Sequence, residues 1–454
     1  MTEQVVLSKE QEIPFNYEIS PKEESLFMAT ILTQPSHIIL KSMEKECEEE
    51  HKINVIEIFS LDEKACPVHN RLFLDKKGAV MQNEYITFKV KSGTDEITCF
   101  SANNKDILSK LDIYDKINLK GTSLVIKTGN KSIFGKGMMI KDLEYYEDKA
   151  EQKTLLNTSQ AIQAFMSNIP KLNYPDEVWN AYKHSLMLSM VYIGINNLIV
   201  GDAGTFKTSI GYSIKNISGG AFQDIPKGTK IGLLGMAVKD ISGKFHLEGG
   251  QIFVAKNNVL VLDEVEKFDD YSYLHPLNEV LANHHLTYSK ADIKYDNGDF
   301  HISLIAMGNP ATTNFNKKQS IYKQIENTFS RNKEFLSRMH MMWGLRNVGF
   351  DVSALMDTSN NKDKEMESQM AIFIAQAKRI KIKENSIDED AKAEQKKFAE
   401  SRYELTKDLR FARKFKEMCM AEAKLNMRDR VMLKDVLAIE SIIGVQDKLL
   451  WGSI

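Results

Sequence analysis

Residues 201–209 read GDAGTFKTS, and this short stretch decides how the chain around it folds. Glycines, a lysine and a hydroxyl residue in this order are typical of a phosphate-binding loop, although Phe206 stands where the strict pattern G-x-x-x-x-G-K-[ST] has its second glycine. The apolar run 198–200 before the loop predicts a buried strand, and SIGYSIKNI after the lysine predicts a helix. Strand, glycine loop and helix therefore occur in the order that a phosphate site needs.

The loop residues have chemistry suited to a nucleotide. Backbone N–H groups at the helix start would hold the phosphates of ATP, Lys207 would reach the β- and γ-phosphates, and Thr208 would bind Mg²⁺. We expect Gly204 to have the unusual backbone conformation and Phe206 to have ordinary helical angles, so that its side chain is tolerated. The predicted nucleotide-binding residues are Gly201, Asp202, Ala203, Gly204, Thr205, Phe206, Lys207, Thr208 and Ser209.

A second element, NNVLVLDEVEKF, supports this interpretation. Its four apolar residues, 259–262, predict a buried strand that delivers Asp263 and Glu264 to its carboxyl end, where ligands of open α/β sheets bind. Asp263 would hold Mg²⁺ and contribute to nucleotide binding, and Glu264 would polarise the attacking water. The alternative, an acidic pair that caps the next helix, is weakened by the phosphate loop upstream.

Three polar residues farther along the chain extend the series. The apolar strand ISLIAMGNP ends in Asn309, whose neutral side chain could orient the water. Arg338 in FLSRMH and Arg410 in DLRFARKF are candidate donors to the γ-phosphate. A single arginine is usually a solvated surface charge, but the ordered series of loop, Asp–Glu, Asn and two arginines favours a catalytic role.

Composition and charge favour an intracellular protein of several domains. The 454 residues suffice for two or three domains with substantial cores. Because the net charge is only -2, a nucleic-acid surface has to be a local patch. The polar N-terminus lacks the apolar core of a signal peptide, and no run approaches the roughly 20 apolar residues of a membrane span. We expect no membrane partner, and a cytoplasmic or nucleoid location if the source is prokaryotic.

The pattern of apolar and polar residues changes along the chain. Short apolar runs broken by turn residues, from about 24 to 146, predict a β-rich domain shaped as a small barrel. From 196, apolar strands alternate with helical segments, which predicts an α/β domain with a mostly parallel sheet. The polar stretch DTSNNKDKEMES, around 356–367, predicts a loop, and a helical pattern follows it. The expected domains are 1–150, 151–355 and 356–454.

In these motifs the chain resembles the minichromosome maintenance (MCM) replicative helicases within the AAA+ ATPases, from about residue 26 to 446. GDAGTFKT resembles the family's GDPGTAKS, which also lacks the second glycine. The segment GLLGMAVKDISGKFHLEGGQIFVAKNNVLVLDEVEKF resembles the family's GLTAxVxxD…IDEFDKM, including an insert in its second helix. IAMGNP, LSRM and LRFARKF resemble AAANP, LSRF and PRQLEAL.

The resemblance implies a multi-domain fold: an N-terminal OB-like barrel with a zinc-ribbon insertion at about 45–72, then an AAA+ α/β P-loop domain with a C-terminal helical lid. It implies that ATP is hydrolysed at subunit interfaces of a homo-hexameric ring, with Arg338 and Arg410 acting on a neighbour's γ-phosphate. The family has a further arginine shortly before the ANP element, where DNGDFHIS offers only His301. The chain ends after the lid, so we expect no C-terminal winged helix and a reduced N-terminal helical subdomain.

The resemblance also points to contacts with single- and double-stranded DNA. Helicases of this type pull DNA through the ring with moving hairpins, and the matching segments here are KDISGK, YSKADIKYDNGD and VIKTGNKSIFGKG. A lysine in a polar loop is more often merely solvated, and phosphate contacts would make binding fall steeply with salt. The candidate DNA-binding residues are Lys127, Lys131, Lys136, Lys239, Lys244, Lys290 and Lys294.

The four cysteines are too few for a disulfide framework in a chain of this length. Two of them fall in paired spacings, Cys47-x₃-His51 and Cys66-x₂-His69, which have the ligand composition of a closed structural Zn²⁺ site. The alternative is an exposed acidic helix with incidental Cys and His. We expect the remaining two, Cys99 and Cys419, to be core residues.

Three functions remain open from the sequence. The leading hypothesis is an ATP-driven DNA helicase of a replicative ring. The others are an AAA+ loader or remodeller that switches on ATP without translocating, and a DNA-binding scaffold with a degenerate ATPase. The helix insert and the hairpin segments favour the helicase, whereas Phe206 and the missing arginine keep the scaffold open.

Overall fold

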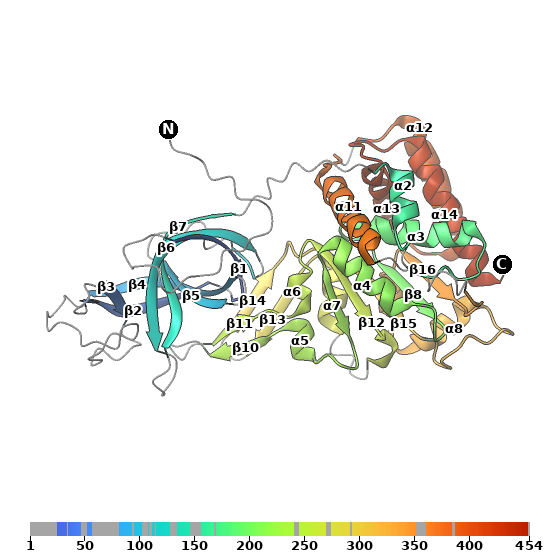
Figure 1. Ribbon diagram of the computed structural model, residues 1–454. Coiled ribbons are helices and arrows are strands. Elements are labelled where there is room, and N and C mark those ends of the chain that lie inside the picture. Colours follow the sequence, from blue (N-terminus) through green and yellow to red (C-terminus); the bar gives the residue numbers. More distant parts are fainter. Residues whose placement is uncertain are drawn as a thin grey trace. The chain divides into compact units, whose positions relative to one another are not determined.

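The computed structural model groups the chain into two compact units, one of 1–151, 235–253 and 288–295, the other of 152–234, 254–287 and 296–454. Figure 1 shows the helices and strands of both. The described residues are 25–33, 35–46, 52–56, 81–92, 95–101, 108, 111–113, 115–127, 134–145, 156–167, 169–239, 245–268, 274–290, 293–350, 360–383 and 386–452.

The second unit is built on a parallel five-stranded sheet, as the alternating pattern predicts. Its strand order is β16-β8-β15-β12-β9, and every neighbouring pair is parallel. The strands β8 and β15 are mostly apolar and buried throughout, because both faces of a parallel sheet are covered. The strands are β8 (Asn197–Gly201), β9 (Ala221–Asp224), β12 (Asn258–Asp263), β15 (Ile302–Gly308) and β16 (Met341–Leu345).

Helices cover this sheet and link it together. The helix α4 packs against β9, β12 and β15, and α3 packs against β8, β12 and β15. Buried apolar side chains line α3 from Val178 to Val191, which explains its place in the core. The helices of this part are α2 (Thr158–Ala164), α3 (Asp176–Val191), α4 (Lys207–Ser218), α5 (Lys230–Leu234), α7 (Leu274–Asn283), α8 (Ile321–Thr328) and α9 (Lys333–Ser337), and the short α6 spans Gln251–Val254.

Four C-terminal helices are drawn in orange and red in Figure 1: α11 (Asn360–Arg379), α12 (Glu389–Thr406), α13 (Phe411–Leu425) and α14 (Leu433–Trp451). The helices α11, α13 and α14 pack on α3, and α12 packs on α13 and α14. The loop predicted around 356–367 is wrong from Asn360 onward, where α11 has already begun. Its Lys, Glu and Met residues are good helix formers, so the stretch is helical without an apolar stripe of its own. None of the helices in the described ranges combines the length and apolar character needed to cross a membrane.

The first unit contains a closed ring of strands. The pairings β1–β4, β4–β5, β5–β7, β7–β6 and β6–β1 return to their starting point, and β5–β7 is the parallel pair among them. Inward side chains such as Phe88, Ile97 and Cys99 form its core. The strands are β1 (Ser25–Ile31), β4 (Met81–Ser92), β5 (Asp95–Ser101), β6 (Lys116–Lys127) and β7 (Phe134–Tyr145), with β2 (Ser36–Glu46) and β3 (Lys52–Ile56) as an antiparallel pair beside them.

One hairpin from later in the sequence, and residues 288–295 of another, belong to the first unit. The antiparallel pair β10 (Met236–Lys239) and β11 (Phe245–Glu248) lies in the segment that the sequence identifies as a helix insert. The second pair is β13 (Leu286–Lys290) and β14 (Ile293–Asn297). Tyr295 of β14 is buried and donates its hydroxyl to Asp112 Oδ2 at 2.6 Å, so the hairpin is tied to the loop before β6.

Candidate functional site

The loop 201–206 connects β8 to α4, as the sequence predicts, but its backbone differs from the expected one. Gly204 is left-handed at φ +78°, which glycine adopts without steric cost. Phe206, expected to have ordinary helical angles, is also left-handed, at φ +57°. The expectation is wrong because the chain has to reverse direction before it enters α4, and position 206 carries part of that turn. This is the position where the strict motif has its second glycine.

The side chain of Phe206 has a partner that partly offsets this strain. Its ring meets the ring of Phe350 edge to face, with centroids 5.0 Å apart. Such aromatic pairs contribute about 0.5–1.5 kcal/mol beyond the burial of their area. The contact anchors the loop to the segment that follows β16.

Lys207 is buried at the floor of the loop. Its Nζ donates to the carbonyls of Gly201 at 2.8 Å and Asp202 at 2.9 Å, and to Thr205 Oγ1 at 3.1 Å. Burial lowers the pKa of Lys207, and the carboxylates of Asp263 and Glu266 oppose this change. The ammonium group is therefore desolvated and held at the start of α4, where an anion would be favoured.

Asp202 fixes the loop from behind. Its Oδ1 accepts the Phe315 N–H at 2.6 Å and its Oδ2 accepts the Asn347 N–H at 2.9 Å. The Asn347 side chain in turn donates to Ala203 O at 3.1 Å. Because the Asp202 carboxylate is buried and satisfied by two backbone donors, its role in the structure is to hold the loop rather than to face a ligand.

The two oxygen groups predicted to bind Mg²⁺ lie together. Thr208 Oγ1 donates to Asp263 Oδ2 at 2.6 Å, although the two residues come from different segments of the chain. Asp263 Oδ1 accepts the Glu264 N–H at 3.0 Å. A hydroxyl and a carboxylate oxygen are the hard ligands that Mg²⁺ prefers, so this pair fits the ion.

Glu264 begins the turn after β12 in a left-handed conformation, φ +57°. Its side chain is partly exposed and its Oε1 pairs with Lys267 Nζ at 2.9 Å. Lys267 is half exposed, so this ion pair is easily exchanged for another partner. Glu264 is thus available at the same sheet edge as Asp263.

Asn309 follows β15, which lies between β8 and β12 in the sheet. Its Nδ2 donates to Glu266 Oε1 at 3.0 Å, and Glu266 Oε2 is buried without a hydrogen-bond partner among the described residues. Burial raises the pKa of Glu266. The sequence analysis did not select Glu266, although a third acidic residue, two positions beyond the Asp–Glu pair, is the signal that could have identified it.

The two predicted arginines come together at a different place. Arg338 follows α9 and pairs with Glu334 Oε1 at 2.7 Å, and Arg410 Nη1 donates to Ser337 Oγ at 2.8 Å. Both line one pocket of about 250 Å³. None of the loop residues 201–209 is among the residues described as lining it.

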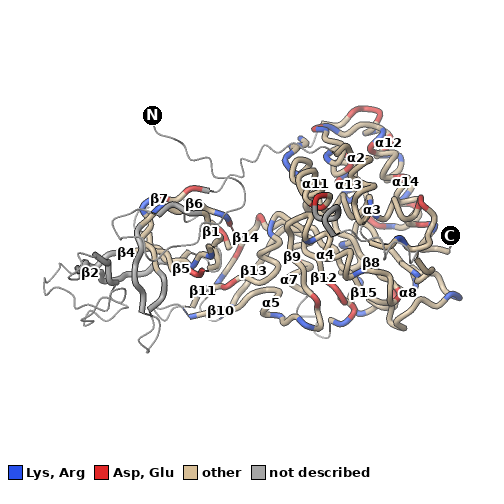
Figure 2. The backbone as a smooth tube through the Cα atoms, viewed as in Figure 1, with Lys and Arg blue, Asp and Glu red and all other residues tan. Residues whose placement is uncertain are grey.

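The candidate DNA-binding lysines are only partly described. Lys290 and Lys294 are exposed on β13 and β14, and Lys239 is exposed at the end of β10 with its Nζ 5.1 Å from the centroid of the Phe245 ring. Lys127 and Lys136 are placed by their backbone in β6 and β7, whereas Lys131 and Lys244 lie outside the described residues. Figure 2 shows basic and acidic residues interspersed along the described part of the chain.

The proposed zinc ligands Cys47, His51, Cys66 and His69 also lie outside the described residues. Among the residues that the structure describes, no group of three or more Cys, His, Asp or Glu residues is arranged to hold a metal ion. Cys99 and Cys419 are buried, as expected for core residues.

A parallel sheet with a phosphate-loop motif after β8, and a carboxylate pair and an asparagine at the ends of β12 and β15, is typical of a P-loop nucleotide-binding domain. Comparison with known families gives the same class, because residues 182–359 match the MCM P-loop domain. This part of the chain is therefore similar to the P-loop domain of the MCM family of AAA+ proteins.

Individual relatives are distant and matched over part of their length. The chain is 27% identical over 151 residues to "DNA replication licensing factor mcm7-B" of Xenopus laevis, covering 33% of this chain and 20% of that protein. It is 26% identical over 156 residues to "DNA replication licensing factor MCM2" of Arabidopsis thaliana, covering 34% and 16%. It is 30% identical over 118 residues to "Minichromosome maintenance protein MCM" of Saccharolobus solfataricus, covering 26% and 17%.

The left-handed backbone at Phe206 leads to a stability prediction. Phe206→Gly and Phe206→Ala both remove the ring, but only Ala keeps the left-handed strain, so the Gly variant should be more stable by about 1 kcal/mol. Tyr212, in the regular part of α4, is the matched control. There the Ala variant should be the more stable one by about 1 kcal/mol. Urea denaturation measures both differences, and the same sign at both positions would contradict the backbone assignment.

Proposed function

We propose that the protein is an ATP-dependent DNA helicase of the MCM type, which hydrolyses ATP at the interfaces of a homo-hexameric ring and unwinds duplex DNA during replication. The observation that carries this proposal is the meeting of Lys207, the Thr208–Asp263 pair and Asn309 at the carboxyl ends of adjacent parallel strands. The names of the relatives, which refer to replication licensing and minichromosome maintenance, supply the biological context.

The loop would bind the triphosphate, with Thr208 and Asp263 as the ligands of Mg²⁺. Lys207 is poised for this task, because its ammonium group is held by two carbonyls and a hydroxyl, which are weaker partners than phosphate oxygens. The bound Mg²⁺ would neutralise charge that develops on the phosphates. Asp202 keeps the loop backbone fixed while its N–H groups take up the phosphate oxygens.

Glu264 would accept a proton from the attacking water, and Asn309 would position that water. Because the Asn309 Nδ2 donates to Glu266, its Oδ1 is the amide atom left to accept a hydrogen bond from the water. Glu266 thus acts as a positioning residue that fixes which end of the amide faces the reaction.

The arginine pocket would complete the reaction from a neighbouring subunit. Arg338 and Arg410 share a pocket that the subunit's own phosphate loop does not line, which is the arrangement that a contribution in trans requires. A fixed positive charge with a planar fork suits the charge spread over transferring phosphoryl oxygens. We infer that each subunit supplies these arginines to the nucleotide of the next.

The first unit would contact DNA. The order of its closed ring, β1-β4-β5-β7-β6, with a parallel pair closing it, supports an OB-like module, and the exposed lysines of the β10–β11 and β13–β14 hairpins would contact phosphates. The zinc site of Cys47, His51, Cys66 and His69 remains a prediction, as do the three-part domain division and an intracellular location.

Two variants separate phosphate binding from water activation. Lys207→Ala and Glu264→Gln should each lower the rate of ATP hydrolysis by at least ~10²-fold, because each removes a transition-state interaction. Only Lys207→Ala should also weaken ATP binding, since Glu264→Gln leaves the loop and the Mg²⁺ ligands intact. Steady-state ATPase assays with and without single-stranded DNA, together with nucleotide titrations, measure both effects. Normal hydrolysis by Glu264→Gln would refute the assignment of the Asp–Glu pair.

The pairing of Asn309 with Glu266 predicts a non-additive double-mutant cycle. Glu266→Ala should lower kcat by about 10- to 100-fold, with little change in ATP affinity, because the residue acts through its neighbour. In the double variant with Asn309→Ala, the loss should be no larger than that of Asn309→Ala alone. Glu266→Gln, which keeps an oxygen acceptor, is the conservative control and should retain most activity. Losses that multiply would show that Glu266 acts independently.

Subunit mixing tests the contribution in trans. Arg338→Ala should be inactive alone, since an arginine finger contributes roughly 10³- to 10⁵-fold in rate. Mixed with Lys207→Ala, it should regain part of the ATPase activity, because some interfaces then pair an intact loop with an intact arginine. Helicase activity should recover less, since translocation needs several competent interfaces. No recovery, in rings shown to exchange subunits, would place the action of Arg338 within its own chain.

A further inference from the structure

The pocket that contains Arg338 and Arg410 holds two more cations, Arg413 and Lys414, both from the first turns of α13. Glu417 is the carboxylate of the same lining. Two further carboxylates pair with the lining cations, since Glu334 contacts Arg338 and Asp408 contacts Lys414. Positive charge still exceeds negative charge around this pocket of about 250 Å³, which favours an anion. Neither the motif LRFARKF nor the family resemblance identifies Arg413 as a residue of the site.

The guanidinium of Arg413 is held by two partners and still faces solvent. Its Nε donates to Glu417 Oε1 at 2.9 Å, and its Nη2 lies 3.3 Å from His284 Nε2. The side chain is 64% exposed. Because these two contacts restrict its rotamers, the exposed side chain of Arg413 can contact a ligand at a lower entropic cost.

The histidine that Arg413 contacts connects it to the segment in which the sequence lacks an arginine. The rings of His284 and His301 stack with centroids 4.1 Å apart. Burial, followed by His301 and Arg413, lowers the pKa of His284, so its neutral ring can accept the Arg413 N–H. The guanidinium of Arg413, on α13, therefore lies next to the stacked rings of His284 and His301.

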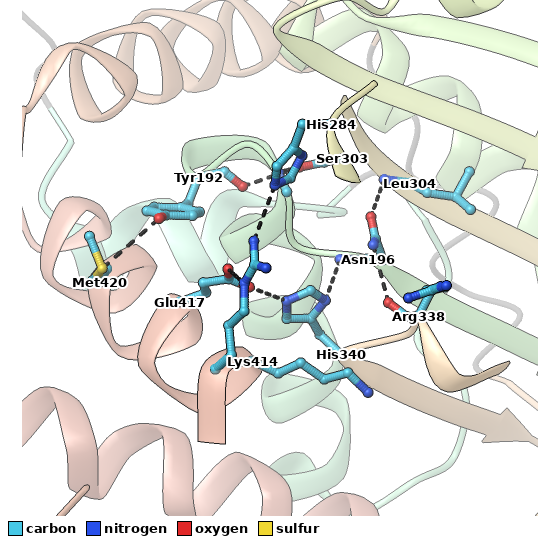
Figure 3. A network of polar contacts seen from close by, with 12 residues as sticks. Tyr192, Asn196, His284, Ser303, Leu304, Arg338, His340, Lys414, Glu417 and Met420 are labelled. Carbon is cyan, nitrogen blue, oxygen red and sulfur yellow. Dashed lines mark hydrogen bonds and ion pairs between the residues drawn. The ribbon is translucent and has the colours of Figure 1, made fainter. Parts of the chain in front are cut away.

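A buried chain of hydrogen bonds fixes the position of Glu417, the carboxylate that holds Arg413 (Figure 3). The Asn196 N–H donates to His340 Nδ1 at 3.1 Å, so the proton of this buried imidazole is on Nε2, which donates to Glu417 Oε2 at 2.9 Å. Burial lowers the pKa of His340, which agrees with a neutral ring. Glu417 is thus fixed through one oxygen and orients Arg413 through the other.

We propose that Arg413 is a third arginine that contacts the phosphate chain of the nucleotide held by a neighbouring copy of the chain, and so supplies from α13 the positive charge that the segment around His301 lacks. The inference rests on the proposed function, because the anion is the ATP of the adjacent subunit. Its physical basis is the shared pocket with Arg338 and Arg410, together with the fixed orientation given by Glu417 and His284.

Two substitutions separate the effect of the positive charge of Arg413 from its structural contact with Glu417. Arg413→Gln removes the charge but keeps an amide that can donate to Glu417, and we expect kcat for ATP to fall by about 10²-fold with an unchanged melting temperature. Arg413→Lys keeps the charge without the planar fork and should lose less. Lys416→Gln, an exposed residue of the same helix outside the pocket lining, is the matched control and should keep the wild-type rate.

Mixing then assigns the direction of the contact. Arg413→Gln combined with Lys207→Ala should regain ATPase activity, as expected for a residue that acts on a neighbour. Wild-type hydrolysis by Arg413→Gln, while Arg338→Ala is inactive, would overturn this inference and leave the proposed function standing. Loss of activity without recovery on mixing would also overturn it. Should Arg413→Gln fail to assemble, Arg413→Ala takes its place, and wild-type hydrolysis by that variant, or a loss that mixing does not recover, would overturn the inference as well. If Arg338→Ala and Glu264→Gln both hydrolysed ATP normally, the proposed function itself would fail.

Discussion

The parallel pairing of β8, β15 and β12 is the constraint on which the candidate site depends. Parallel strands end at the same edge of a sheet, so the three segments that follow them are brought together although they lie far apart in the chain. The pairing is stabilised by strands whose central residues are mostly apolar and buried, so it cannot shift without exposing the core. The contact between Thr208 and Asp263 is a direct consequence of this register.

Both segments that carry the proposed chemistry have a left-handed residue other than glycine. Phe206 precedes α4 and Glu264 follows β12, each at φ +57°. Such a conformation costs roughly 1–2 kcal/mol per residue, and it persists only where the surrounding structure determines it. The buried carboxylate of Asp202 and the Phe206–Phe350 contact supply that support at the loop. Strain therefore coincides with the place where the chain turns most sharply toward the site.

A second polar centre connects the sheet to the C-terminal helices. Asn196, just before β8, donates its side-chain amide to Arg338 O at 3.2 Å and accepts the Leu304 N–H at 2.9 Å. Its backbone N–H reaches His340, which continues through Glu417 into α13. A buried network of this kind is fully satisfied only in one arrangement of its members. The arginines at its edge are thus oriented by residues that belong to the sheet, so the nucleotide edge and the arginine pocket are parts of one framework.

The sequence by itself determined the strand, loop and helix around Lys207, the buried strands that end at Asp263 and Asn309, and the helical character of the C-terminal part. These features follow from local apolar patterns and from motifs, both of which consist of residues that are neighbours in the sequence. It did not determine the backbone of Phe206, because the direction of the turn depends on how β8 and α4 pack. It placed a loop where α11 begins, since a polar stretch carries no apolar stripe. The tertiary structure alone decided that Glu266 holds Asn309 and that Arg413 contacts His284, because these partners come from segments that only folding brings into contact.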